Sequence, residues 1–212
     1  MFEPTVRLLS VTDAFEQTPI DLIEYAGRVD YGPASRAKMG DKTVIKRWID
    51  SGHQSMIEMV DAAFEITCSR VVSHELVRHR IASFQQESQR YVKYDEEAAD
   101  DLFFIPPELS QTEALIVKHA YEDALVAYKK LKILGVKSQM ARYVLPNGTR
   151  TRIIMKANLR EWMHFCKLRC HSSAQPEMQI IANDILDRLY YMYPEVFDSV
   201  VQEVEDGNRA IR

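Results

Sequence analysis

The sequence predicts an α+β fold in which helices pack on a mostly antiparallel sheet. Segments with a strand pattern are few and segments with helical periodicity are long, which favours this class. The chain has 212 residues and is 46% hydrophobic, so it can bury one substantial core but is too short for two comfortable domains. We therefore expect a single domain that covers residues 1–212.

The first part of the chain predicts a strand and two helices. Residues Thr5–Val11 are apolar enough for an opening strand. Thr18 followed by proline predicts a helix over residues 20–28, because proline suits the first helical turn. Asp41 is the expected cap of a second helix, which Gly52 ends.

An alternating strand and a short helix lead to the most polar stretch of the chain. Residues 60–68 alternate between apolar and polar side chains, which is the pattern of a half-buried strand. Ser69 is the expected cap of a helix that ends near Arg78. This helix would deliver the polar stretch at its end, where side chains can converge. Residues 90–94 are expected to be extended.

A long amphipathic helix is predicted in the middle of the chain. It follows an acidic segment, residues 95–101, that we expect to be a solvated loop. Ser110 and Glu113 have the spacing of a capping box. Apolar residues recur behind this box with helical spacing as far as Gly135, and we expect them to form a core face. They are Leu115, Ile116, Ala120, Leu125, Tyr128, Leu131 and Leu134.

The C-terminal part predicts one more strand among helices. A short helix over residues 138–144 holds Arg142, and residues 149–157 are strand-like. A last amphipathic helix is predicted over residues 178–193. The polar tail from Gln202 is expected to fray, because chain ends are poorly ordered unless something holds them.

A second polar cluster lies on the helix predicted over residues 159–170, for which Asn158 is the expected cap. Spacings of four and five residues put Arg160, His164 and Arg169 broadly on one side of this helix.

The stretch from Arg78 to Arg90 is the most unusual part of the sequence. It contains three arginines, a histidine, two serines and three glutamines in thirteen residues, and Glu87 is its one acidic side chain. Arginine is almost never fully buried without a partner, so this surplus of positive charge favours an external anion. Planar guanidinium groups suit phosphate and carboxylate oxygens better than lysine does. We interpret the stretch as a phosphate-ligand site.

Charge and cysteine content narrow the class of protein. The formal net charge of −4 argues against binding to nucleic acid and favours a small anionic ligand. An odd number of cysteines, Cys68, Cys166 and Cys170, favours a reduced, cytoplasmic protein. The sequence has neither a secretion signal nor an apolar run long enough to span a membrane, so we expect no membrane association.

The spacing within the arginine-rich stretch resembles the signature of the flavin-dependent thymidylate synthases. Arg78, His79 and Arg80 are followed by seven residues and then by Ser88, which matches that family's motif in full. The alternative interpretation of the same residues is a solvated basic turn.

Two further patterns of the family match this sequence. The first consists of Gly52, His53, Ser55 and Glu58, and the second of Asn158, Arg160 and Leu168-Arg169. The resemblance therefore extends from Gly52 to about Gln179. Three positions depart from the family pattern: Met59 stands where histidine is usual, Glu75 where glutamine is frequent, and His164 where asparagine is expected.

The resemblance implies an enzyme that makes dTMP by reductive methylation of dUMP. In that family methylenetetrahydrofolate supplies the methylene group, reduced FAD supplies the hydride, and NADPH is the usual reductant. Family members are homotetramers whose active sites draw on several chains. The protein itself would bind, orient and polarise, because the redox chemistry belongs to the flavin.

The resemblance also implies roles for individual residues. Those expected to hold FAD are His53, Ser55, Arg78, His79, Arg80, Gln86, Asn158, Arg160 and His164. Those expected around dUMP are Glu75, Leu76, Val77, Arg78, Gln86, Glu87, Ser88, Gln89, Arg90, Arg142 and Arg169. Arg169 is the expected catalytic residue, because its cation would favour negative charge that develops on the uracil ring. Without the family match, His53 could equally be a solvated loop histidine.

Rival sites are weaker. His74 and His79 lie five residues apart, whereas the metalloprotease helix needs two histidines four apart, so we expect no metal there. A zinc site at His164, Cys166, Cys170 and His171 would lack the spacing of a known finger or ribbon. A structural zinc protein of this kind and an RNA-binding module at residues 78–90 are the other functions that stay open. Bound flavin would exclude both.

Overall fold

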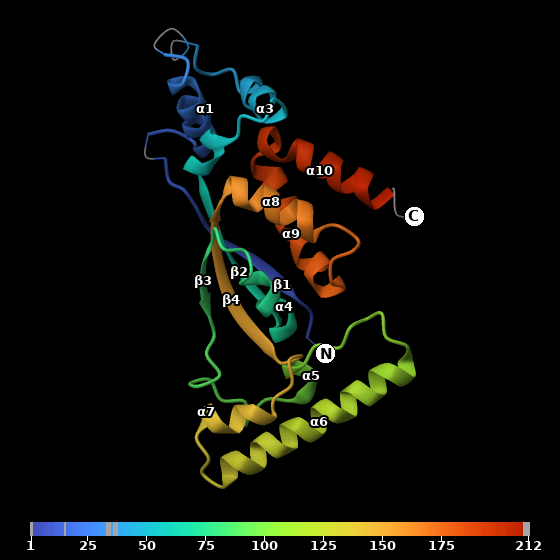
Figure 1. Cartoon of the computed structure of the whole chain (residues 1–212). Coiled ribbons are helices and arrows are strands. Elements are labelled where there is room, and N and C mark those ends of the chain that lie inside the picture. Colours follow the sequence, from blue (N-terminus) through green and yellow to red (C-terminus); the bar gives the residue numbers. More distant parts are fainter. Residues whose placement is uncertain (1, 15, 33–34, 36–37, 210–212) are drawn as a thin grey trace. The chain divides into compact units, whose positions relative to one another are not determined.

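The computed structural model describes residues 2–14, 16–32, 35 and 38–209, with side chains as far as residue 207 (Figure 1). Its strands are β1 (Thr5–Val11), β2 (Asp61–Ser69), β3 (Ser83–Gln86) and β4 (Arg150–Asn158). Its helices before β4 are α1 (Pro19–Val29), α3 (Thr43–Asp50), η1 (Ser55–Met59), α4 (Arg70–Leu76), α5 (Ala99–Leu102), α6 (Gln111–Ile133), α7 (Ser138–Ala141) and η2 (Arg142–Val144). After β4 come α8 (Leu159–Arg169), α9 (Pro176–Met192) and α10 (Pro194–Arg209).

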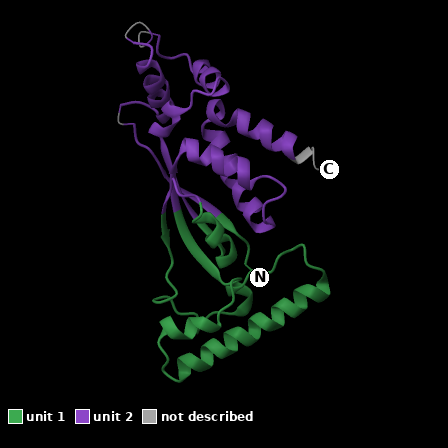
Figure 2. Cartoon of the chain, in the orientation of Figure 1, with its two compact units in different colours: residues 1–5, 66–78, 84–154 green, residues 6–65, 79–83, 155–212 purple. Residues whose placement is uncertain are grey.

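The strands form one antiparallel sheet in the order β1-β2-β4-β3, which confirms the predicted α+β class. The two long central strands differ in burial: β2 is buried along most of its length, whereas β4 alternates between buried and more exposed residues. Phe64, Ile66 and Cys68 of β2 and Ile153 and Met155 of β4 are fully shielded from solvent. The described residues cluster into two compact units, which Figure 2 colours separately. The boundary between the units falls within β2 and within β4, so it does not coincide with the ends of these strands. The single domain stays a prediction.

Unit 1 consists of the described residues within 1–5, 66–78 and 84–154. Its core gathers aromatic and aliphatic side chains from α5, α6, α7 and the segments on either side of α5. The members that are buried are Tyr94, Leu102, Phe103, Leu125, Tyr128 and Ala141. The capping box of α6 is present as predicted, with Ser110 and Glu113 each bonded to the other's backbone N–H.

Unit 2 consists of the described residues within 6–65, 79–83 and 155–212. Helices α8, α9 and α10 pack on one another, and α10 also packs on α3. Trp162 is buried at the centre, edge-on to Phe64 and Phe165, and its indole N–H donates to the carbonyl of Ala62 at 3.1 Å. Burying the one polar atom of an indole is favourable only with such a partner.

Most predicted elements are confirmed to within one to three residues. Strand β1 has the predicted bounds, β2 and β4 are shifted by one residue, and α1, α4, α6 and α8 start at the predicted caps. Gly52 has a φ of +83°, the left-handed conformation that ends α3 and that glycine adopts without strain.

The cap of α3 and the core face of α6 were predicted wrongly. Lys42, not Asp41, is the cap residue of α3, although the Asp41 carboxylate still accepts from the backbone N–H of Thr43 at 3.2 Å. On α6, Leu115, Ile116 and Leu134 are 49%, 65% and 78% exposed, whereas Leu125 and Tyr128 are buried. Periodicity shows which residues share a helical face but not how much of that face a neighbour covers.

The polar regions on either side of α6 also differ from expectation. Residues 90–94 are not an extended segment, because the carbonyl of Ser88 accepts from the backbone N–H groups of Tyr91 and Val92 and closes a turn. Strand β3 was not predicted. The acidic loop before α6 contains the short helix α5, in which Leu102 is buried.

The C-terminal tail is helical as far as Arg209 rather than frayed from Gln202. Val196, Phe197, Val200 and Val204 are at most 9% exposed, and their spacing is that of one helical face. The apolar pattern of this helix was present in the sequence and is what anchors the tail.

Candidate functional site

The arginine-rich stretch begins where α4 ends. Ser69 caps α4 by accepting from the backbone N–H of Val72, and the N–H of Arg78 donates to the carbonyl of Glu75 just past the last turn. Leu76 is fully buried, whereas Val77 and Arg78 are exposed. Of the motif, Arg78 and Ser88 lie in unit 1 and His79 and Arg80 in unit 2.

In unit 1, polar bonds hold β3 against its neighbours. The amide nitrogen of Gln86 donates to Ser73 Oγ at 2.9 Å and to Thr151 Oγ1 at 3.2 Å, so its donor capacity is used inside the protein. The carboxylate of Glu87 accepts from the hydroxyl of Tyr94 at 3.0 Å. Burial, and then the charge of Glu87, raises the pKa of Tyr94, which keeps that hydroxyl a donor.

The turn after β3 presents the rest of the predicted nucleotide contacts. Ser88 Oγ accepts from the backbone N–H of Arg90 at 3.3 Å, and the Arg90 guanidinium lies 5.7 Å from the ring centre of Tyr91. Gln89 is 8% exposed, and no acceptor among the described residues bonds its amide nitrogen. A buried donor without an acceptor costs about 1–3 kcal/mol, which makes Gln89 a candidate for bonding a ligand.

Three of the residues predicted around the nucleotide are arginines of unit 1. Arg78 and Arg90 are exposed and Arg142, in η2, is half-buried. Within the described part of the chain, no carboxylate forms a hydrogen bond or ion pair with any of these three guanidinium groups. By contrast, Arg150 of the same unit is paired with Glu97 at 3.2 Å.

In unit 2, a histidine links two charged residues. His79 Nδ1 lies 3.2 Å from Glu161 Oε1, and the Nε–H of Arg169 donates to His79 Nε2 at 3.1 Å. His79 and Glu161 are 6% and 7% exposed. Burial lowers the pKa of His79, the nearby Arg169 and His164 lower it further, and the bond with Glu161 opposes them without reversing the direction.

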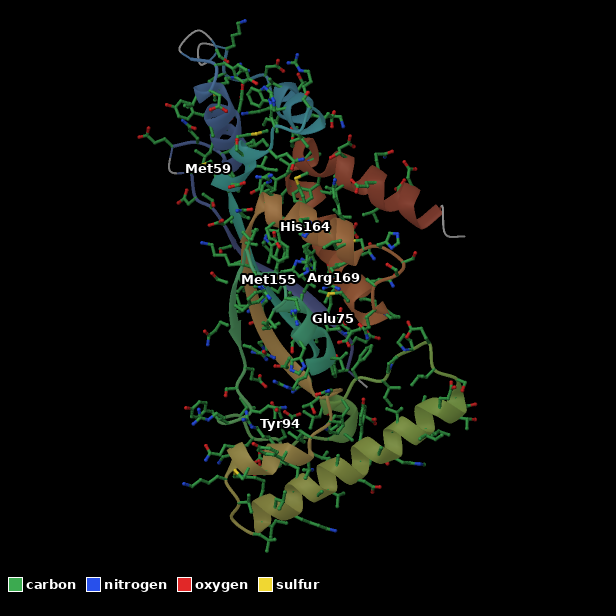
Figure 3. The ribbon with its side chains drawn as sticks, viewed as in Figure 1. Met59, Glu75, Tyr94, Met155, His164 and Arg169 are labelled. Carbon is green, nitrogen blue, oxygen red and sulfur yellow. The ribbon has the colours of Figure 1, made fainter. Side chains whose placement is uncertain are left out.

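The start of α8 uses the other predicted flavin contacts within the protein. Asn158 Oδ1 accepts from the backbone N–H of Glu161 at 2.9 Å as the helix cap, and Arg160 is paired with Glu58. His164 is exposed one turn later, with its ring centre 6.2 Å from that of His79. Figure 3 shows His164 and Arg169 along α8.

The loop after α3 places His53 beside aromatic residues. The hydroxyl of Tyr31 lies 3.3 Å from His53 Nδ1, and the Tyr31 ring stacks on Trp48 with a centre distance of 5.9 Å and an interplanar angle of 9°. The Arg28 guanidinium lies over the indole of Trp48, 5.9 Å from the ring centre. Ser55 begins η1 and is exposed.

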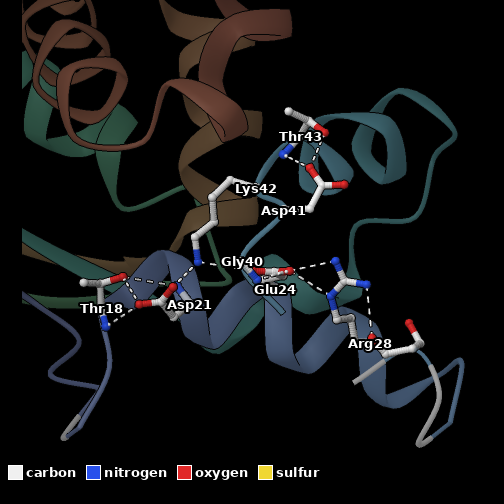
Figure 4. Close-up of polar contacts among 9 residues, drawn as sticks. Thr18, Asp21, Glu24, Arg28, Gly40, Asp41, Lys42 and Thr43 are labelled. Carbon is white, nitrogen blue, oxygen red and sulfur yellow. Dashed lines mark hydrogen bonds and ion pairs between the residues drawn. The ribbon is translucent and has the colours of Figure 1, made fainter. Parts of the chain in front are cut away.

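Figure 4 shows the ionic network that anchors this region, which the sequence did not predict. Glu24 is fully buried and accepts from Arg28 Nε at 2.8 Å and from the backbone N–H of Gly40 at 3.0 Å. Lys42 pairs with Asp21 and, at 3.2 Å, with Glu24. Burial raises the pKa of Glu24, but the bonds from Gly40, Arg28 and Lys42 outweigh it and the pKa is lowered, so Glu24 is charged.

The cysteines lie away from solvent. Cys68, Cys166 and Cys170 form no disulfide with one another and have at most 1% exposure, and burial raises the pKa of Cys166 well above its usual range. Across the residues that the structure describes, no three His, Cys, Asp or Glu side chains are placed to hold a metal ion. The same residues include no helix long and apolar enough to cross a membrane.

Each unit thus brings some of the predicted residues together. In unit 1, Gln86 to Arg90 follow one another along β3 and its turn, and in unit 2, His79 contacts Arg169. Sequence analysis missed Glu161, Ser73, Thr151 and Tyr94. Glu161 alone carried a signal, because Asn158-x-x-Glu161 has the spacing of a capping box.

The fold and these side chains define an α+β protein with three arginines, Arg78, Arg90 and Arg142, to which no carboxylate of the described chain is bonded. The chain belongs to the flavin-dependent thymidylate synthase family, since the sequence model described as "Thymidylate synthase complementing protein" matches residues 7–195. A protein of Pyrococcus furiosus named flavin-dependent thymidylate synthase is 35% identical over 185 residues, which are 82% of this chain and 76% of that protein. A protein of Geobacter sulfurreducens with the same name is 40% identical over 149 residues, which are 69% of this chain and 63% of that protein.

A solved structure shares the fold. It is a UMP/dUMP methylase from Streptomyces cacaoi bound with 5-Br dUMP, with a TM-score of 0.81 and 24% identity. The likeness covers 94% of this chain and 95% of that one.

Proposed function

We propose that this protein is a flavin-dependent thymidylate synthase that methylates dUMP to dTMP. The observation that carries the proposal is the full family motif, Arg78 to Ser88, in a chain whose relatives bear that name. The structure supports it because Arg78, Arg90 and Arg142 have no carboxylate bonded to them within the described chain. Three guanidinium groups suit a phosphate dianion.

The nucleotide would bind mainly through unit 1. Arg78, Arg90 and Arg142 would hold the phosphate, and the buried amide of Gln89 would donate to the nucleotide. Glu87 is already oriented by its bond from Tyr94. Ser88, Gln86 and the α4 end from Glu75 to Val77 would complete the predicted contacts.

The side chains of unit 2 suit a flavin dinucleotide. Arg80 is exposed and His164 presents an imidazole to solvent, and both can donate to pyrophosphate oxygens. Ser55 adds an exposed hydroxyl. His53 lies in the same unit, with its Nδ1 atom 3.3 Å from the hydroxyl of Tyr31. Arg160 and Asn158 would contribute less directly, because Glu58 and the α8 backbone engage them. Bound FAD would supply the hydride chemistry, and NADPH would reduce it.

Arg169 would act on the uracil ring. A fixed guanidinium favours negative charge that develops on the ring, and this preorganised stabilisation is worth about a hundredfold or more in rate. Methylenetetrahydrofolate would supply the carbon. Following the family, we propose a cytoplasmic homotetramer whose active sites draw on several chains.

A spectrum and a product assay test the proposal. Purified protein, after incubation with FAD and removal of the excess, should show a bound-flavin absorbance. It should then convert dUMP to dTMP with methylenetetrahydrofolate and NADPH, and omission of either should stop product formation. Arg169→Ala should bind FAD but lose about a hundredfold in kcat. A protein that binds no flavin and forms no dTMP would overturn the assignment.

A further inference from the structure

The bonds of His79 with Arg169 and with Glu161 together determine which tautomer the histidine adopts. A guanidinium N–H can only donate, so His79 Nε2 must carry a lone pair where the Arg169 Nε–H meets it at 3.1 Å. The proton of the neutral ring is then on Nδ1, where Glu161 Oε1 accepts it at 3.2 Å. The three side chains form a chain of donors that runs from Arg169 to His79 to Glu161.

Burial of His79 and Glu161 restrains these hydrogen-bonded side chains. His79 is 6% exposed and its ring stands edge-on to Phe165 with a centre distance of 5.0 Å. Glu161 is 7% exposed. Both ring nitrogens are engaged inside the protein, so no donor or acceptor of His79 remains for a ligand in this arrangement.

The start of α8 provides a second observation: the Glu161 carboxylate bonds His79 instead of the backbone of its own helix start. In α1 and α6 the acidic residue at the third helical position bonds the backbone N–H of its cap, closing a capping box at Asp21 and Glu113. Asn158 and Glu161 have the same spacing, and Asn158 does cap the helix. The carboxylate of Glu161 nevertheless bonds His79, so the usual local partner of such a residue is forgone.

We propose that Glu161 and His79 are positioning residues that hold the guanidinium of Arg169 in its working orientation. This inference rests on the proposed function, in which Arg169 acts on the uracil ring. His79 then belongs to the site through Arg169, whereas the family motif alone assigned it to the flavin. Protonation of His79 would place an N–H opposite the Arg169 N–H and break the hydrogen bond between these two side chains.

The state of His79 can be read without any turnover. Nitrogen-15 spectra of histidine-labelled protein report the tautomer, and His79→Gln identifies the His79 signal among the six histidines. Wild type should show a neutral Nδ1–H tautomer at pH 7. In Glu161→Ala the signal should become a mixture of tautomers. In Glu161→Gln the tautomer should persist, because the amide oxygen still accepts from Nδ1–H.

Turnover should follow the tautomer. Glu161→Ala should lower kcat for dTMP formation about tenfold or more, the scale of one buried bond that orients a charged donor. Glu161→Gln should recover most of that loss. As a matched control, Glu65→Ala removes the acid that pairs with Arg7 at 2.9 Å in the same unit and should leave kcat unchanged.

The pH profile gives a third readout. The charged and titratable groups that face His79 are Glu161, Arg169 and His164, and Glu161 alone favours its protonated form. Glu161→Gln should therefore lower the pKa of His79 further and move the acid limb of kcat to lower pH. A variant that was only loosely folded would lose activity at every pH without this displacement.

The outcomes separate the two proposals. Wild-type kcat and a wild-type tautomer in Glu161→Ala would overturn the positioning role, as would an Nε2–H tautomer in wild-type protein. A wild type that forms no dTMP would overturn the proposed function instead. The nitrogen-15 spectra would still show whether His79 is held between Arg169 and Glu161. If Glu161→Ala fails to fold, Glu161→Gln decides through the acid limb: no displacement would overturn the role.

Discussion

Gly27 lies directly under the indole of Trp48: a methyl group on Gly27 would come within 2.4 Å of Cζ3 and 2.8 Å of Cε3. Both residues belong to unit 2, where Trp48 stacks with Tyr31 and also lies under the Arg28 guanidinium, and where Tyr31 contacts His53. The missing side chain at position 27 therefore lets the indole approach the α1 backbone and supports the loop that carries His53.

Gly27→Ala should destabilise the protein. Alanine favours helix by about 1 kcal/mol over glycine, but overpacking a closed site costs about 1–3 kcal/mol, so the free energy of unfolding should fall. Gly207→Ala in α10 is the matched control, because its nearest contact would be an ordinary 3.4 Å to His171. Urea unfolding measures both. A gain in stability for Gly27→Ala equal to that of the control would contradict the close packing.

The network around Lys42 predicts a pH dependence. The Lys42 side chain, and then the bonds with Thr18, lower the pKa of Asp21 from 3.8 to about 2. Because the folded-state pKa is depressed, this stabilisation is fully present above about pH 4 and is lost as the pH falls toward 2. Asp21→Asn should therefore be less stable than wild type at pH 7, with a gap in unfolding free energy that narrows as the pH falls from about 4 toward 2. Urea titrations at several pH values test this, and a constant gap would refute it.

Gln89 should affect stability and binding in opposite directions. Its buried amide nitrogen has no acceptor among the described residues, so Gln89→Leu should leave the unfolding free energy unchanged or raise it by up to about 1–3 kcal/mol. The same change should weaken dUMP binding about tenfold or more, if the amide bonds the nucleotide.

Tyr128→Phe is the control for Gln89, because the hydroxyl of Tyr128 is the other buried group of unit 1 without a protein partner in the described chain. It should resemble Gln89→Leu in stability yet bind dUMP like wild type. Calorimetric titration gives the affinities. Equal dissociation constants for wild type and Gln89→Leu would remove Gln89 from the site.

The phosphate of dUMP should dominate recognition. We expect dUMP to raise the Tm of the protein and deoxyuridine not to, because the dianion makes charge-assisted bonds to the arginines. Arg90→Ala should weaken dUMP binding by roughly 2 kcal/mol. Thermal shifts and titration calorimetry measure these effects, and equal shifts from both ligands would argue against the phosphate assignment.

No thiol should take part in the reaction. Cys68, Cys166 and Cys170 are buried, and burial raises the pKa of Cys166, so these sulfur atoms are poorly accessible and Cys166 is not a ready thiolate. A thiol reagent should label the folded protein slowly and all three cysteines in urea. The triple Cys→Ala variant, if folded and flavin-bound, should keep kcat within about an order of magnitude, in contrast to Arg169→Ala. Loss of its activity would mean that a cysteine participates.

Local chemistry was enough to predict much of this fold. The caps at Thr18, Ser69, Ser110 and Asn158 bond groups three residues away, so their signals lie within one short window of sequence. The family motif likewise lies in one window and was enough to place the chain in its family. For the same reason the apolar pattern that holds α10 could have been read, since its buried residues share a single helical face.

Contacts between distant segments could not be predicted in this way. Glu161 and Arg169 meet His79 from 82 and 90 residues along the chain, and nothing within either segment specifies the other. The same holds for α6, where Leu125 is buried and Leu115 is exposed although both are leucines of one helix. Burial, tautomer and pKa depend on which segments pack together, because desolvation and hydrogen bonding act through space rather than along the chain.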